Sequence, residues 1–218
     1  MDREEATEMI DHPGEGMRNA PVPRLIAIGS STGGPRALQQ VLTDLNAAGH
    51  VETPVLIVQH MPAGFTQLLA KRLDSFSEHH VKEAENGECI RKKTIYIAPA
   101  DYHMEIVKYR TELKIELTQS PPKKGHRPSV DVMLESLSKL SVSLIAVILT
   151  GMGNDGTQGI KALKENDPFI QLIAESEETS VVFGMPKSAI ATNLVDFILP
   201  LHRIGGKIKE IITGLGGN

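Results

Sequence analysis

The sequence predicts an α/β fold of the doubly wound class: a mainly parallel sheet with helices on both faces, plus an antiparallel hairpin region. Strand-like and helix-like segments alternate along most of the chain, which is typical of parallel strands joined by helical crossovers. The expected strands are continuous apolar runs, as in residues 25–28 and 54–58, and such runs indicate burial on both faces of a sheet.

The first unit sets the pattern for the others. The strand at residues 25–28 leads through a turn at 29–34 into a helix that runs to about Leu45, and Pro35 suits the first position of that helix. Beyond the strand at 54–58, the pattern predicts helices near residues 65–76, 130–140, 157–164 and 204–213, and strands near 144–149 and 170–174.

The stretch between residues 94 and 117 follows a different pattern. Residues 94–98, 103–107 and 112–117 are short strand-like segments with no room for helices between them. We expect all three to pair antiparallel, as hairpins beside the main sheet.

Composition and charge limit the classes of protein. Residues 1–23 lack hydrophobic periodicity and contain three prolines, so we expect a disordered tail or linker there and a single domain over residues 24–218. No apolar run reaches the ~18 residues that span a bilayer, so no membrane insertion is expected. The net charge of −4 argues against nucleic acid as a partner. The single cysteine, Cys89, and the lack of a secretory signal fit the cytoplasm.

Three loops should meet where the chemistry of such a fold is usually found, beyond the carboxyl ends of the parallel strands. They are residues 29–34, 59–62 and 151–156. The first contains G-x-S-x-G between a strand and a helix, the context of a nucleophile elbow, and this pattern selects Ser31 over Ser30. The N-terminus of the following helix would supply N–H groups and positive potential beside an oxyanion.

A serine nucleophile needs a base, and the base needs a carboxylate to orient it. His60 ends the adjacent expected strand and is the candidate base. Asp155 lies in a glycine-rich loop after another buried strand and is the candidate carboxylate, with Asp101 and Asp131 as rivals that spacing alone cannot rank. His126 and Arg127, just before the helix near 130–140, are further candidates to face the site.

The sequence gives less support to other functions for these loops. A phosphate-binding turn is disfavoured because Gly33 and Gly34 do not complete G-x-G-x-x-G and no P-loop motif is present. The chain order Ser, His, Asp differs from the α/β-hydrolase order Ser, Asp, His, in which His202 would be the base. No metal is expected, because the sequence has no H-x-x-x-H motif and no cysteine–histidine cluster.

Six stretches, in this order, resemble the catalytic domain of the CheB family, the chemotaxis protein-glutamate methylesterases. They are residues 25–34 (LIAIGSSTGG), 59–65 (QHMPAGF), 96–101 (YIAPAD), 126–131 (HRPSVD), 148–156 (ILTGMGNDG) and 181–186 (VVFGMP). The resemblance covers about residues 24–213 and is far more specific than the elbow motif alone.

The resemblance implies that Ser31 is the nucleophile, His60 the base and Asp155 its orienting carboxylate. It also implies that the backbone of Met152 helps to hold the oxyanion, and we expect Thr32 to line the same site. The implied activity is hydrolysis of glutamyl methyl esters on the cytoplasmic helices of methylated chemoreceptors, with possible deamidation of glutamines as a second activity. No cofactor is implied.

The chain departs from the family pattern in two places that bear on function. Only about 23 residues precede the first strand, so the receiver domain that usually precedes the family's catalytic domain is not expected in this chain. Glu175 stands where the family usually has glutamine, which alters the charge beside the expected cleft. The alternative to an enzyme is a catalytically silent module that binds receptor helices or an anion at the turn 29–34.

Overall fold

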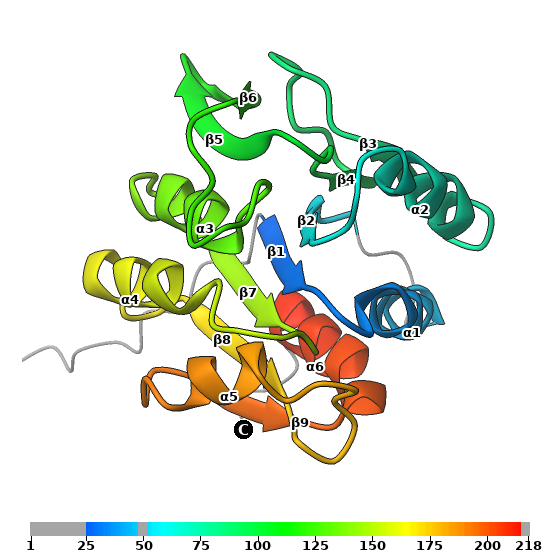
Figure 1. The fold of residues 1–218 in the computed structure, drawn as a ribbon, viewed down its shortest axis with the longest axis vertical. Coiled ribbons are helices and arrows are strands. Elements are labelled where there is room, and N and C mark those ends of the chain that lie inside the picture. Colours follow the sequence, from blue (N-terminus) through cyan, green and yellow to red (C-terminus); the bar gives the residue numbers. More distant parts are fainter. Residues whose placement is uncertain (1–24, 48–51, 215–218) are drawn as a thin grey trace, which may run out of the picture.

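A computed structural model describes residues 25–47 and 52–214 of the chain (Figure 1). The strands are β1 Leu25–Ser30, β2 Val55–Gln59, β3 His80–Glu83, β4 Thr94–Ile97, β5 His103–Tyr109, β6 Glu112–Thr118, β7 Leu144–Ile148, β8 Gln171–Glu175 and β9 Phe197–Leu199. The helices are α1 Gly34–Ala47, α2 Phe65–Asp74, α3 Val130–Ser138, α4 Thr157–Asn166, α5 Met185–Ile190 and α6 Leu201–Thr213.

The main sheet has seven strands in the order β3-β4-β2-β1-β7-β8-β9, and every neighbouring pair in it is parallel. β5 and β6 form a separate antiparallel hairpin. The strand order reverses at β1, so the loops after β1, β2 and β7 lie together at one edge of the sheet, as in other doubly wound folds. The predicted fold class is confirmed.

The sheet separates two apolar cores because successive side chains of a strand point to opposite faces. Leu25 and Ala27 of β1 pack under α3, α4, α5 and the hairpin, whereas Ile26 and Ile28 pack under α1, α2 and α6. Figure 1 shows these two groups of helices on opposite sides of the sheet. All six residues of β1 are buried, as the continuous apolar run predicted.

The expectation for residues 94–98 was wrong. β4 does not join a hairpin but lies within the parallel sheet, between β3 and β2. Ile95, Tyr96 and Ile97 are all buried, which is the pattern of a strand covered on both faces. The short spacing to the next strand suggested a hairpin, but the chain leaves the sheet at Pro99, and among the described strands only β5 and β6 pair antiparallel.

The expected tail, residues 1–23, lies outside the described residues, as do residues 215–218 at the other end of the expected domain. Three short elements, β3, α5 and β9, were not among the sequence-based predictions. Of the helices within 25–47 and 52–214, none combines the length and apolarity that a bilayer crossing requires.

A buried glutamine fixes the ends of the two central strands relative to each other. The β1–β2 register pairs Ser30 with Gln59, and the Ser30 hydroxyl donates to Gln59 Oε1 at 2.7 Å. Gln59 Nε2 donates in turn to the carbonyl oxygens of Ser31, at 2.9 Å, and His60, at 2.8 Å. One buried side chain therefore fixes the backbone just beyond the ends of both β1 and β2.

Replacing this glutamine should destabilise the fold. In Gln59→Leu the Ser30 hydroxyl and two carbonyl groups lose a buried partner, so we expect the free energy of unfolding to fall by about 1–3 kcal/mol. Urea unfolding measures the change. Gln67→Leu, on the exposed face of α2, is the control and should stay within about 0.5 kcal/mol of the parent protein. Equal stability of the two variants would contradict a clamping role for Gln59.

Candidate active site

Ser31 and His60 are brought side by side by the sheet itself. They are the residues that follow the paired positions Ser30 and Gln59, and the backbone N–H of His60 donates to the Ser30 carbonyl at 3.0 Å. The N–H of Ser31 donates to the carbonyl of Thr150, just beyond β7, at 3.0 Å. The turn that carries Ser31 is thus attached to both neighbouring strands.

His60 and Asp155 form a hydrogen-bonded pair. His60 Nε2 lies 2.8 Å from Asp155 Oδ2, and the side chains are 9% and 1% exposed. The other ring nitrogen of His60, Nδ1, is buried and has no hydrogen-bond partner among the described residues. One imidazole nitrogen is therefore held by a carboxylate, while the other remains able to bind a hydroxyl group.

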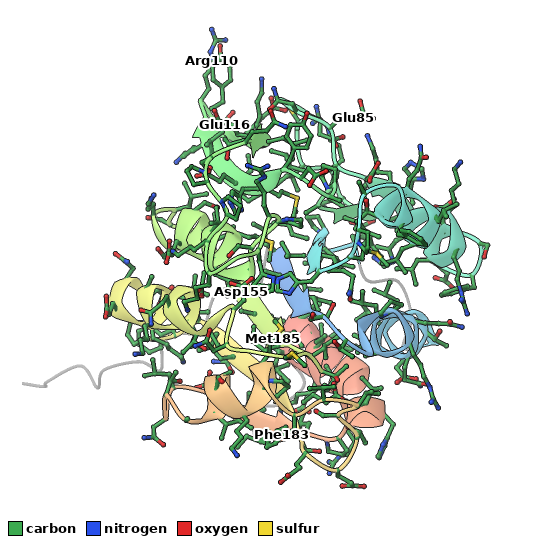
Figure 2. The ribbon with its side chains drawn as sticks, in the orientation of Figure 1. Glu85, Arg110, Glu116, Asp155, Phe183 and Met185 are labelled. Carbon is green, nitrogen blue, oxygen red and sulfur yellow. The ribbon has the colours of Figure 1, made fainter. Side chains whose placement is uncertain are left out.

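The carboxylate of Asp155 accepts four further hydrogen bonds, three of them at the start of α3. The donors are the Ser129 hydroxyl and the backbone N–H groups of Val130, Asp131 and Gly156, at 2.8–3.0 Å. Burial alone would raise the pKa of Asp155, but the bonds from His60, Asp131, Val130 and Ser129 outweigh it and hold the pKa at about 2. Figure 2 shows Asp155 near the middle of the molecule, far from Arg110 and Glu116 on the hairpin.

The rival carboxylates occupy other places. Asp131 is buried, but its Oδ1 accepts the N–H groups of Gln158 and Gly159 at the start of α4, and its Oδ2 accepts Lys124 Nζ. It caps a helix and does not orient His60. Asp101 is exposed in a turn with a positive φ of 67°.

His202 lies on another side of the Ser31 turn. It is exposed in the first turn of α6 and lines a cavity of about 290 Å³ together with Gly33, Thr150 and Glu175. Within the described part of the chain its ring makes no hydrogen bond to a carboxylate, in contrast to that of His60. The geometry therefore favours His60 over His202 as the partner of Ser31.

Backbone N–H groups of Thr32 and Met152 have no acceptor among the described residues. Both residues are exposed and flank Ser31, one in its own turn and the other in the loop after β7. Gly151 permits this close approach, because a Cβ atom there would lie 2.7 Å from Ser31 Cβ and 2.5 Å from Met185 Sδ. The two N–H groups are thus candidates to bind an anionic oxygen.

His126 is a site residue that the sequence suggested without giving it a role. Its ring stacks on His60, with centroids 3.9 Å apart and planes within 5°. Burial and the charge of the neighbouring His60 lower the pKa of His126. The negative charge of Asp155 opposes this shift but is the smaller effect. The stacked ring of His126 restricts the plane of the His60 ring.

A metal centre finds no support in the described segments, since they contain no group of three or more histidine, cysteine or acidic residues placed to hold an ion. No residue is therefore assigned to a metal.

These features define a doubly wound α/β protein with a histidine–aspartate pair beside a serine turn at the carboxyl ends of its strands. Residues 26–208 match the CheB methylesterase family, and the chain belongs to that family.

The similarity extends to individual proteins and to a solved structure. A protein-glutamate methylesterase/protein-glutamine glutaminase of Halalkalibacterium halodurans is 54% identical over 86% of this chain and 54% of its own length. The protein of that name from Geobacillus kaustophilus is 50% identical over 88% and 54%. The crystal structure of the Thermotoga maritima CheB methylesterase catalytic domain has a TM-score of 0.82 and 44% identity, covering 87% of this chain and 98% of that one. The chain thus spans about half the length of the curated relatives that it matches.

The low pKa of Asp155 predicts a pH-dependent contribution to stability. Because the pKa falls from 3.8 to about 2 on folding, the ionised carboxylate stabilises the fold above pH ~4, and this contribution is lost as the pH falls towards 2. Its size is roughly 2 kcal/mol. Urea unfolding of the parent protein and Asp155→Asn should show a difference that shrinks between pH 5 and 3. A difference that does not change with pH would contradict the assignment.

Proposed function

We propose that this chain is the catalytic domain of a protein-glutamate methylesterase that acts through a serine acyl-enzyme. The observation that carries the proposal is the His60 ring, which is bound to Asp155 through Nε2 and has a buried Nδ1 with no partner among the described residues, on a residue that the β1–β2 register places next to Ser31. Such a ring can accept a proton from a neighbouring hydroxyl, which is what a serine nucleophile requires.

The proposed reaction has two stages. Ser31 Oγ attacks the ester carbonyl while His60 Nδ1 takes the hydroxyl proton, and Asp155 stabilises the imidazolium ion that forms. The N–H groups of Thr32 and Met152 bind the oxygen of the tetrahedral intermediate. His60 then protonates the departing methoxide, which leaves as methanol. Water, activated by the same histidine, hydrolyses the acyl-enzyme to a glutamate carboxylate and restores Ser31.

The proposed substrates are glutamyl methyl esters on the cytoplasmic helices of methylated chemoreceptors, which places the protein in the cytoplasm. The relatives named above are called methylesterases and glutaminases, and this supports a second activity on glutamine side chains. The same steps would serve an amide, with ammonia in place of methanol as the leaving group.

A catalytically silent module that binds receptor helices or an anion at the turn 29–34 is the alternative. It accounts for the free N–H group of Thr32, but it gives no reason for a histidine whose side chain is only 9% exposed and is held by an aspartate with a pKa of about 2. A binding turn alone does not require an oriented base, so the enzyme explains more of the site.

The first test concerns the nucleophile. Ser31→Ala should lower kcat by at least roughly 10⁴-fold, since loss of one triad member has that effect in serine hydrolases. Ser30→Ala is the control, because the Ser30 hydroxyl is buried and bound to Gln59, and its loss should affect stability more than turnover. Methanol released from a methylated receptor and hydrolysis of a small nitrophenyl ester are the two measurements. A stronger loss in Ser30→Ala would refute the assignment.

The second test concerns the base. His60→Ala should abolish hydrolysis of both substrates, whereas His202→Ala should leave hydrolysis of the small ester nearly intact, because His202 is exposed at the start of α6. Circular dichroism would confirm that both variants are folded. If His202→Ala is the inactive variant, the proposed mechanism must be abandoned.

A further inference from the structure

Glu175, the last residue of β8, carries a fully buried carboxylate that the proposed chemistry does not use. Oε2 accepts the backbone N–H of Thr150 at 2.8 Å, and Oε1 accepts the hydroxyl of Thr179 at 3.0 Å. No ion pair joins Glu175 to a cationic side chain within residues 25–47 and 52–214.

Stability alone does not explain this carboxylate. A buried charge without a cationic partner is unfavourable, and an apolar side chain of similar size is often equally or more stabilising. Burial raises the pKa of Glu175, against the smaller opposing effects of its bonds from Thr150 and Thr179. The feature that sets Glu175 apart is therefore the group that it binds.

That group belongs to Thr150, which connects the Ser31 turn to the loop after β7. The Thr150 carbonyl accepts the N–H of Ser31 at 3.0 Å, and its hydroxyl donates to the carbonyl of Thr32 at 2.9 Å. The same hydroxyl accepts the N–H of Val182 at 2.9 Å. Thr150 is thus hydrogen-bonded both to Ser31, the proposed nucleophile, and to Thr32, the residue that follows it.

Any shift of Thr150 would also reach the site through the next residue. Gly151 packs against Ser31 so closely that an added Cβ atom would lie 2.7 Å from Ser31 Cβ. Met152, whose N–H is a candidate oxyanion donor, follows directly. Glu175 therefore holds a residue that is hydrogen-bonded directly to Ser31 and is separated from Met152 by Gly151 alone.

We propose that Glu175 is a positioning residue for acyl transfer: by accepting the Thr150 N–H, it fixes the Ser31 turn and the Met152 N–H relative to each other. The inference rests on the proposed function. Without an acceptor, the Thr150 N–H would be buried and unsatisfied, and the end of β7 would move to find water or another partner. A displacement of about 1 Å can lower turnover by roughly 10²-fold.

The test compares two substitutions of similar size. Glu175→Met removes the acceptor, and we expect kcat for a small nitrophenyl ester to fall about 10- to 100-fold with KM little changed. Glu175→Gln keeps an acceptor, because its carbonyl oxygen can face Thr150 while its amide donates to the Thr179 oxygen. It should retain kcat within roughly 3-fold of the parent protein.

Thermal unfolding separates positioning from a merely structural role. Glu175→Met removes a buried carboxylate that has no cationic partner, and this gain offsets the cost of leaving the Thr150 N–H unsatisfied, so its melting temperature should stay within about 4 °C of the parent protein. Thr179→Val is the matched control: it removes the other donor to Glu175, leaves the Thr150 bond in place and should retain kcat.

Two results would overturn the proposal. One is a kcat in Glu175→Met within roughly 3-fold of the parent protein. The other is a loss of activity in both Glu175 variants accompanied by a matching fall in melting temperature. Ser31→Ala, assayed beside them on the same ester, separates this failure from failure of the proposed function. An inactive Ser31→Ala with an active Glu175→Met refutes positioning alone, whereas an active Ser31→Ala refutes the serine mechanism.

Discussion

The arrangement of the site depends on one carboxylate, that of Asp155. It accepts hydrogen bonds from His60 at the end of β2, from three groups at the start of α3 and from Gly156 at the start of α4. Three elements, β2, α3 and α4, are thus joined through two oxygen atoms. The positive potential at the N-terminus of α3 favours the ionised form of the group.

The orientation of His60 follows from this arrangement. His60 leaves β2 with its carbonyl held by Gln59 Nε2, and its ring extends far enough that Nε2, the outer nitrogen, reaches Asp155. Nδ1, the nitrogen nearer to the backbone, is left buried and without a partner among the described residues. His126 stacks on the ring and restricts its rotation. Strand register, carboxylate and stacking together leave the ring with one orientation.

Much of the fold could be predicted from local patterns because the strands are buried on both faces. The apolar runs located β1, β2 and β7, and their register then brought Ser31 and His60 together. The prediction failed at β4, where a spacing argument outweighed an equally apolar run. It could not find β3 or β9, since edge strands are short and partly exposed and carry little periodic signal.

The candidate site was predictable to the extent that its residues follow strand ends. Ser31, His60 and Asp155 were all identified in this way, and their roles remain predictions. Spacing alone could not rank Asp155 above Asp101 and Asp131, since the difference between the three carboxylates lies in the groups that each one meets in the folded chain. The stacking of His126 on His60 depends on the path of the chain before α3, for which hydrophobic periodicity carries no information.

The two buried carboxylates of the site region illustrate how environment assigns different tasks to the same chemical group. Asp155 accepts five hydrogen bonds, one of them from His60, and its pKa is about 2, so it stays ionised and can balance a developing imidazolium charge. Glu175 accepts two bonds, and its pKa is raised by burial. Both bonds of Glu175 come from groups that need only an acceptor, the backbone N–H of Thr150 and the hydroxyl of Thr179. The contrast in binding partners therefore favours an electrostatic role for Asp155, which binds the His60 ring, and a geometric one for Glu175, which binds a backbone N–H group.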